Sequence, residues 1–231
     1  MQNKPYVTGI SNDLDNSIKE NMGPARLNFL CDYCLPSDKN IKILDVGCGT
    51  GRNMLYLIEN GYKNVVGIEY DEDLYIPMEK KYSDLNIVNG NAEDLHIFQD
   101  ESFDLVYCNH VLEHLPSPQK AISEAWRVLK KGGRYMIGIP NGRHLNDMVM
   151  RKIQLLYYGK TDHLQTFSLK KITELLNNQG FSVGRIAKYY GSLDLILDKR
   201  IKLPKFMKNS LYGLCKKFIG GEISFDILSK K

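Results

Sequence analysis

Three glycines at alternate positions, Gly47, Gly49 and Gly51, are the residues of this 231-residue chain whose spacing most clearly serves chemistry. They follow an apolar run that ends at Val46 and precede a helical apolar pattern. Glycine permits positive φ and leaves bare backbone for a ligand, and a strand–turn–helix unit points backbone N–H groups at that ligand. Arg52 stands where a dinucleotide-binding sequence needs a third glycine, and the turn lacks the Gly-Lys-Ser/Thr of a phosphate loop. The segment therefore predicts a ligand-binding turn of another kind.

The sequence IKILDVGCGTGRN (Ile41–Asn53) resembles motif I of the class I S-adenosylmethionine (SAM) dependent methyltransferases. The resemblance covers residues 41–139 closely and the remainder loosely. It implies that SAM is the cofactor and that Asp45 helps to orient its methionine ammonium group. It also implies cofactor contacts from the turn itself, at Gly47, Cys48, Gly49 and Gly51.

Two later positions agree with this resemblance. Glu69 ends the second apolar run about 20 residues beyond the glycines, where an acidic group can accept hydrogen bonds from both ribose hydroxyls. The loop Asn91-Ala92-Glu93-Asp94-Leu95 resembles the family's adenine-binding loop, which implies that Asn91 and Ala92 meet the adenine edge. The family has aspartate at the position of Asn91, and an amide can still accept from an exocyclic amine through its oxygen.

The acceptor end of the site is expected after the fourth strand. The resemblance implies that Asn109 and His110 lie beneath the cofactor, between its methionine end and the methyl acceptor. Methyl transfer to a hydroxyl needs a base, and histidine titrates near neutral pH. His163, in the segment TDHLQTFS, is the leading candidate because related small-molecule enzymes often carry a histidine in a similar segment; His110 is the second candidate. His114 is interpreted as a structural hydrogen-bonding group beside the site.

The elements that position these residues alternate between strand and helix, which predicts a doubly wound, mostly parallel sheet of seven strands with the last strand antiparallel. The expected strands are Ile41–Val46, Asn64–Glu69, Leu85–Val88, Phe103–Cys108, Arg134–Ile139, Phe181–Tyr189 and Glu222–Leu228. The expected helices are Arg52–Glu59, Glu72–Lys81, Pro118–Leu129 and Ser168–Asn178, with Pro77 an obstacle inside the second.

The whole chain, residues 1–231, is predicted to be one domain. Residues 1–38 are expected to hold an N-terminal helical segment, and residues 142–167 and 191–221 are expected to be substrate or lid insertions. Residues 205–219 combine an apolar helical face with lysines, which is compatible either with peripheral membrane contact or with a lid helix packed on its own domain.

Composition sets the class of protein. A hydrophobic fraction of 43% and a charged fraction of 25% are typical of a soluble globular domain, and the net charge of +4 does not indicate a nucleic-acid partner. The first residues lack the apolar core of a signal peptide. The five cysteines are scattered, which fits a reducing cytoplasm, and the lone pair Cys31 and Cys34 lacks the further ligands of a metal site.

We therefore expect a cytoplasmic SAM-dependent methyltransferase that acts on a small or medium-sized acceptor, at oxygen, without a metal. Glycan, quinone and lipid-linked acceptors are all compatible with the sequence. The sequence does not determine the oligomeric state. The alternatives are a SAM-binding protein without catalysis and a protein or RNA methyltransferase. The second is disfavoured because Asn109-His110-Val111-Leu112 replaces the NPPY-like sequence of exocyclic-amine methylation. An NAD-dependent dehydrogenase is disfavoured by Arg52.

Overall fold

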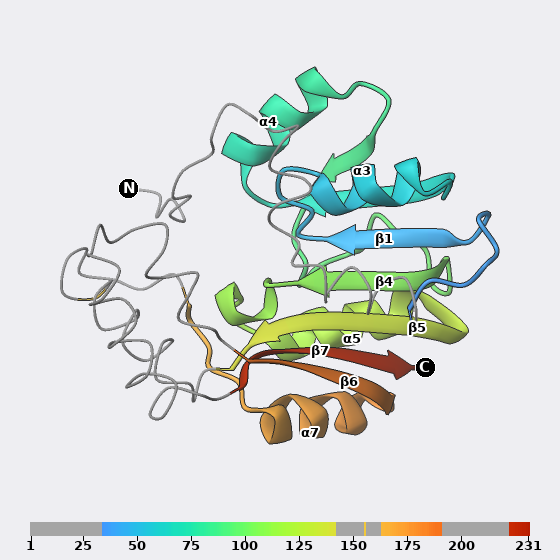
Figure 1. Ribbon diagram of the computed structural model, residues 1–231. Helices are drawn as coiled ribbons and strands as arrows, with labels where there is room; N and C mark the ends of the chain where they lie inside the picture. Colours follow the sequence, from blue (N-terminus) through green and yellow to red (C-terminus); the bar gives the residue numbers. More distant parts are fainter. Residues whose placement is uncertain (1–33, 142–154, 156–162, 191–221) are drawn as a thin grey trace, which may run out of the picture.

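The structure, a computed structural model, describes residues 34–141, 155, 163–190 and 222–231 (Figure 1). Most of the predicted N-terminal helical segment, most of the first insertion and all of the second lie outside the described residues. The same holds for residues 205–219, so the predicted amphipathic pattern and its membrane contact remain sequence-based. Among the helices of the described residues, none is long and apolar enough to cross a membrane.

The first five strands alternate with helices, as the sequence predicts, except that a loop without a helix connects β3 to β4. The elements, in chain order, are β1 (Lys42–Val46), α3 (Arg52–Glu59), β2 (Asn64–Glu69), α4 (Glu72–Lys81), β3 (Asn86–Asn89), β4 (Phe103–Asn109), the 3₁₀ helix η2 (Leu112–His114), α5 (Pro118–Val128), β5 (Leu129–Pro140), α7 (Leu169–Gln179), β6 (Ser182–Tyr190) and β7 (Glu222–Lys230).

These strands form one seven-stranded sheet in the order β3-β2-β1-β4-β5-β7-β6. Strands β1 to β5 pair in parallel, whereas β7 runs antiparallel to both of its neighbours. The expected α/β fold with an antiparallel last strand is confirmed. Strand order reverses between β1 and β4, so the loops after these two strands face each other at the carboxyl edge, where open α/β sheets bind ligands.

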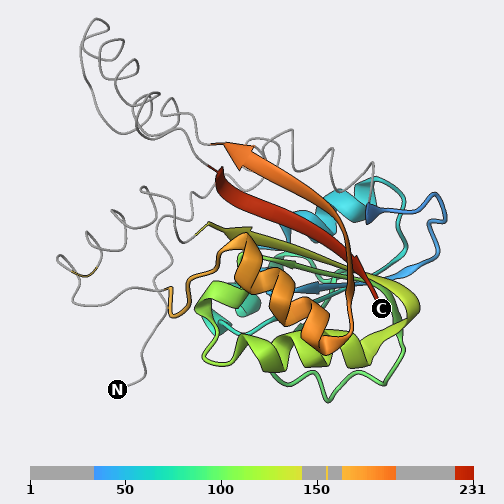
Figure 2. The ribbon, with the colours of Figure 1, turned by 90° about the horizontal axis from the view of Figure 1, so that it is seen from below.

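Each face of the sheet has its own apolar core. Alternate residues of a strand point to opposite faces, and β1 and β4 divide their side chains accordingly. One core joins the strands to α5 and α7, which lie side by side beneath the sheet in Figure 2: Leu44, Val46, Val106, Cys108, Ala121, Ile122, Ile172 and Leu176. The other core includes α3: Ile43, Leu105, Tyr107, Met54 and Leu57.

The helix boundaries follow from local chemistry. The Asp71 side chain caps α4 by accepting from the Asp73 N–H at 2.9 Å, and acidic residues in the first turn and lysines in the last complement the helix dipole. These contributions let α4 continue through Pro77, which the sequence treats as an obstacle. Helix α7 is capped by Ser168 and ends at Gly180 in the left-handed region.

The largest departure from the predicted bounds is at β5. The sequence predicts a strand from Arg134, yet β5 begins at Leu129, directly after α5. Its register against β4 jumps between Leu129 and Arg134, so Lys130 to Gly133 form a bulge in a longer strand. In the sequence, two lysines followed by two glycines are typical of the end of a helix. In the structure, these four residues form the bulge in β5.

Candidate active site

The glycine turn after β1 has the conformation that the sequence predicts. Gly47, Gly49 and Gly51 all have positive φ, between 56° and 71°. A Cβ on Gly47 would collide with the Val111 side chain of the loop after β4, so this glycine permits close packing of the two loops. A Cβ on Gly49, by contrast, would meet no atom of the described residues within 4 Å. The backbone at Gly49 therefore borders open space, which suits the approach of a ligand.

Glu69 ties this turn to the end of β2. Its side chain is 8% exposed; Oε2 accepts from the Gly49 N–H at 2.7 Å and Oε1 accepts from the Asp71 N–H at 2.9 Å. Each carboxylate oxygen can accept more than one hydrogen bond. The carboxylate is thus held in one orientation by backbone donors and retains acceptor capacity for hydroxyl groups.

Asp45, near the end of β1, is a candidate partner for a positively charged group of the ligand. Its side chain is 1% exposed, and neither carboxylate oxygen has a hydrogen-bond partner among the described residues. Burial, and secondarily the charge of Glu69, raises the pKa of Asp45 to about 8. A buried carboxylate without a partner is costly unless a cation or donor meets it. A ligand with an ammonium group would satisfy this requirement.

The side chain of Cys48 is buried and does not face such a ligand. Its thiol is buried against Gly67, whose Cβ, if present, would lie 2.8 Å from the sulfur. Burial, reinforced by the charges of Asp45 and Glu69, raises the pKa of the Cys48 thiol well above its ordinary value. The residue therefore lies at the predicted place, with its side chain in the core.

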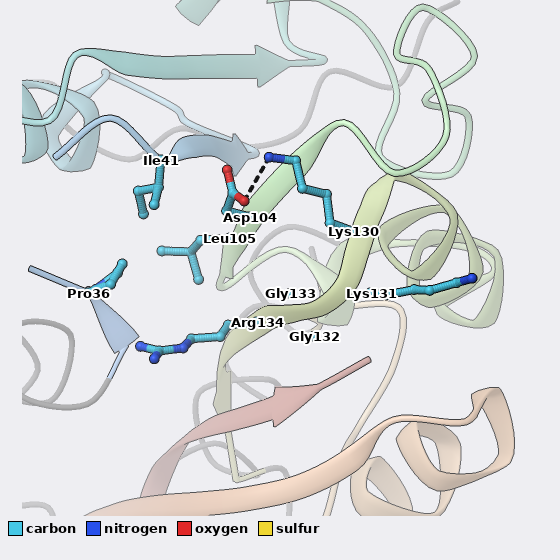
Figure 3. A pocket seen from close by; sticks show the side chains of 9 residues that line it. All are labelled: Pro36, Ile41, Asp104, Leu105, Lys130, Lys131, Gly132, Gly133 and Arg134. Atoms are coloured by element: carbon cyan, nitrogen blue, oxygen red, sulfur yellow. Dashed lines mark hydrogen bonds and ion pairs between the residues drawn. The ribbon is translucent and has the colours of Figure 1, made fainter. Parts of the chain in front are cut away.

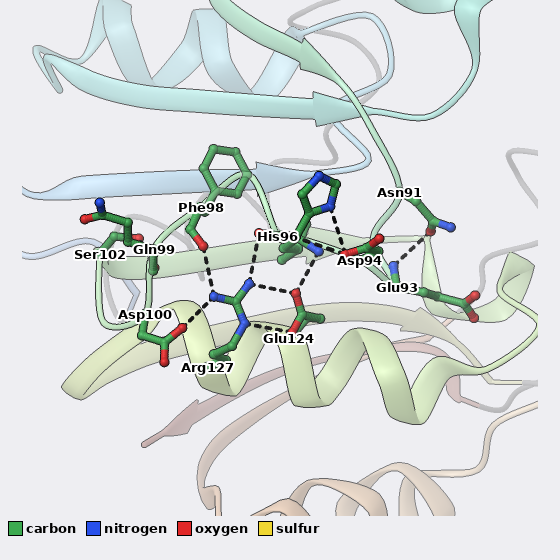
Figure 4. Close-up of polar contacts among 11 residues, drawn as sticks. Asn91, Glu93, Asp94, His96, Phe98, Gln99, Asp100, Ser102, Glu124 and Arg127 are labelled. Carbon is green, nitrogen blue, oxygen red and sulfur yellow. Dashed lines mark hydrogen bonds and ion pairs between the residues drawn. The ribbon is translucent and has the colours of Figure 1, made fainter.

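The predicted adenine loop follows β3. The Asn91 side-chain oxygen accepts from the Glu93 N–H at 2.9 Å, and the Asn91 carbonyl accepts from the Asp94 N–H at 3.0 Å (Figure 4). Ala92 is buried in the core. The side-chain oxygen of Asn91 is used by the hydrogen bond from the Glu93 N–H, so its NH₂ group is the other polar end of the side chain. An aspartate at this position would have a second acceptor oxygen there.

Arg127, on α5, holds the continuation of this loop and was not predicted from the sequence. Its guanidinium donates to the carbonyls of Leu95 and Phe98, each at 2.9 Å, and pairs with Glu124 and Asp100 at 2.7 Å (Figure 4). Hydrogen bonding to Arg127 is the main cause that lowers the pKa of Glu124. The spacing of Glu124 and Arg127 on one helix was the available signal, but their carbonyl partners are set by the fold.

The turn after β4 is constrained in the way functional turns often are. His110 has φ of 55°, rare for a non-glycine residue, and its N–H donates to the Gly138 carbonyl at 2.9 Å. The Asn109 side-chain oxygen is buried without a hydrogen-bond partner among the described residues. His110 Nδ1 lies 3.0 Å from Glu113 Oε1. Glu113 is 1% exposed and was not predicted as a site residue.

His163 lies against this turn. Its ring packs edge-to-face on the ring of His114, with centroids 4.9 Å apart. The Gln165 N–H donates to the Glu113 carbonyl at 2.9 Å, which fastens the segment before α7 to η2. Both predicted catalytic histidines, His110 and His163, therefore belong to one cluster with Glu113 and His114.

A surface pocket at the other edge of the sheet is unrelated to these groups. It is lined by residues near the starts of β1 and β4 and by the β5 bulge, among them Ile41, Asp104 and Gly132 (Figure 3). The Lys130 ammonium pairs with Asp104 at 2.7 Å beside it. Since parallel strands bring their ligand-binding loops to the carboxyl edge, this pocket does not compete with the glycine turn as a site.

Known proteins resemble the chain in sequence and in fold. Residues 44–137 match a family described as a methyltransferase domain. A ubiquinone biosynthesis O-methyltransferase of Coxiella burnetii is 30% identical over 168 residues, which cover 69% of this chain and 70% of that protein. A Mycolicibacterium smegmatis protein described as a "probable S-adenosylmethionine-dependent methyltransferase" is 31% identical over 141 residues, 61% of this chain and 52% of that protein.

The chain thus spans about half the length of that second relative, and the match to an uncharacterised Methanocaldococcus jannaschii protein covers 63% of the relative. Among solved structures, a SAM-dependent methyltransferase of Archaeoglobus fulgidus has a TM-score of 0.65 at 22% identity, over 87% of this chain and 91% of that one. A methyltransferase of the same description from Mesorhizobium loti has a TM-score of 0.65 at 17% identity, over 90% and 99% of the two chains. At these identities the solved structures establish the fold alone.

Proposed function

The chain belongs to the class I SAM-dependent methyltransferases, and we propose that it transfers the methyl group of SAM to an oxygen atom of a small or medium-sized acceptor. The observation that carries the proposal is Asp45, a buried carboxylate without a partner beside a glycine turn that borders open space. The methionine portion of SAM supplies the ammonium group that this carboxylate requires.

The positions of the loops support the remaining cofactor contacts that we propose. Glu69 receives the ribose hydroxyls while backbone donors hold its carboxylate. The backbone of Gly47, Cys48, Gly49 and Gly51 is assigned to the methionine and ribose portions of SAM. Asn91 and Ala92 meet the adenine edge, with the amide of Asn91 directed by its bond to the turn.

Methyl transfer mainly requires that the acceptor atom and the methyl group are aligned. The sulfonium is a good leaving group, so the protein must hold the acceptor atom and the methyl carbon about 3 Å apart and in line. Asn109 and His110 are proposed to lie beneath the reacting atoms. Removal of the acceptor's hydroxyl proton is assigned to the cluster that contains His110 and His163, because it combines imidazoles with a carboxylate at the predicted acceptor side.

The acceptor class is proposed from the relatives and the sequence together. The name of the Coxiella burnetii relative supports an oxygen acceptor of quinone type, whereas glycan and lipid-like acceptors remain alternatives. A cytoplasmic location, and membrane contact through residues 205–219, are proposed from sequence alone.

Calorimetric titration with S-adenosylhomocysteine, the product of SAM-dependent methyl transfer, tests the cofactor assignment. We expect micromolar or tighter binding, followed by methyl transfer in a screen of hydroxylated quinone and glycan precursors. His163→Ala should keep this affinity and lose turnover. Absence of binding to the folded protein would overturn the proposal; binding with no transfer to any acceptor would favour a SAM-binding protein without catalysis.

A further inference from the structure

Three side chains with metal-binding atoms meet at the acceptor side of the site. Glu113 and His114 come from η2, and His163 comes from the segment before α7. One candidate ligand atom from each residue lies within 4.8 Å of the other two. The sequence did not predict this set, because its third member is distant along the chain and reaches the others only in the folded structure.

The carboxylate of Glu113 is a second, independent observation that points to a ligand at this place. The side chain is buried, and its Oε1 is 3.0 Å from His110 Nδ1, whereas its Oε2 has no hydrogen-bond partner among the described residues. A buried carboxylate oxygen without a partner is unfavourable unless a donor or cation meets it. Carboxylates that bind metals are themselves often hydrogen-bonded, which is the part that His110 plays here.

We propose that Glu113, His114 and His163 bind one divalent first-row transition-metal ion. Two imidazoles and one carboxylate form the ligand set of catalytic zinc and of mononuclear non-haem iron sites. Bonds of about 2.1 Å in tetrahedral geometry place ligand atoms about 3.4 Å apart, so atoms that now lie within 4.8 Å of one another must approach by up to about 1.4 Å. Both imidazoles are at least partly exposed, so an ion can reach them from solvent.

The position of this set relative to the glycine turn suggests a role. The Val111 side chain packs against Gly47 of the cofactor turn. The Val111 carbonyl accepts from the His114 N–H at 2.9 Å. The metal therefore lies one loop away from the cofactor turn, with at least one coordination position left for an acceptor oxygen.

This role rests on the proposed function. A hydroxyl oxygen of the acceptor binds the ion, which lowers its pKa, and the proton passes to solvent. The oxygen then forms a bond to the methyl carbon of SAM while the carbon–sulfur bond breaks. The electron pair of the broken carbon–sulfur bond remains on sulfur, so the product is neutral S-adenosylhomocysteine. In this scheme the cluster promotes loss of the hydroxyl proton through the bound ion, and His163 acts as a metal ligand instead of as a free imidazole base.

Zinc binding to the full-length, untagged chain tests the site directly. The protein is dialysed against a chelator and then a metal-free buffer, and Zn²⁺ is titrated in competition with a chromophoric chelator. We expect one equivalent to bind. His163→Gln and Glu113→Gln should each weaken binding at least tenfold. His96→Ala is the matched control, because this exposed histidine pairs with Asp94 away from the cluster and should bind zinc as tightly as wild type.

Cobalt substitution adds a second measurement, since visible bands of the Co²⁺ protein report nitrogen and oxygen ligation, and these bands should change in His163→Gln. Circular dichroism establishes that each variant is folded. Failure to bind one equivalent, or equal affinity in His163→Gln and wild type, would overturn the metal site. Because neither measurement uses SAM or an acceptor, S-adenosylhomocysteine binding without zinc binding refutes the metal site alone, and the converse result refutes only the proposed function.

Discussion

Asp45→Asn offers the sharpest test of the cofactor pocket, because it should stabilise the free protein while weakening cofactor binding. Burial raises the pKa of Asp45 from an ordinary 3.8 to about 8, so the folded state holds this proton more tightly than the unfolded state. The sign follows from linkage: stability is greatest below pH 3.8 and falls as the pH rises towards 8. The Asn side chain has nearly the same shape but does not titrate, so the variant does not lose stability in this way as the pH rises.

The size of the effect follows from the two pKa values. One unit corresponds to about 1.4 kcal/mol. Relative to low pH, the requirement to keep Asp45 protonated in the folded state therefore lowers stability by at most about 4 kcal/mol at pH 7 and about 1.7 kcal/mol at pH 5. Water entry and local relaxation reduce such penalties. We therefore expect Asp45→Asn to raise the free energy of unfolding by about 1 to 3 kcal/mol at pH 7, and by less than half as much at pH 5.

Urea unfolding of the ligand-free wild type and variant at pH 5 and pH 7 measures this difference. Asp84→Asn, at an exposed carboxylate before β3, is the control and should change little at either pH. Titration with S-adenosylhomocysteine, which keeps the methionine ammonium, should show binding weakened by about 10- to 100-fold, as for a charge-assisted hydrogen bond left unmade. A stability difference that is the same at both pH values, or unchanged affinity, would refute the reasoning.

Three further substitutions, one of them with a control variant, probe the predicted cofactor site. Glu69→Ala should weaken S-adenosylhomocysteine binding by about 1 to 3 kcal/mol in calorimetry, and unchanged affinity would remove its assignment to the ribose. Gly47→Ala should lower the free energy of unfolding by about 2 to 4 kcal/mol, since it adds a clash with Val111 to the cost of positive φ. Gly61→Ala, with positive φ but open space, should cost only about 1 kcal/mol in the same urea assay. Asn91→Asp should tighten binding about three- to tenfold, because it restores an acceptor for the adenine amine; weaker binding would place the adenine elsewhere.

The parts of the fold that the sequence predicts well are those determined locally. Alternating apolar runs and helical patterns locate β1, α3 and β2, and the glycine turn is recognisable because positive φ and close packing demand that residue type. Glu69 follows from its place at the end of β2. Each of these signals is contained within about 20 residues.

The parts that the sequence does not predict depend on contacts between distant segments. The bulge in β5 is set by pairing with β4, and Lys130 to Gly133 alone resemble a helix end. Glu113 was overlooked because an acidic residue in a short loop is usually exposed, and its burial results from the packing of that loop against the rest of the site. The carbonyl partners of Arg127 likewise become neighbours only after folding.

The position of β7 between β5 and β6 has a consequence for how the chain folds during translation. Among the strands of the described chain, β6 bonds only to β7, which is made later. On the ribosome, β1 to β5 and the glycine turn can assemble while residues 182–190 still lack a pairing partner. This half of the sheet must close by joining segments far apart in sequence, a slow kind of event, and the exposed edge of β5 is vulnerable to aggregation until it does.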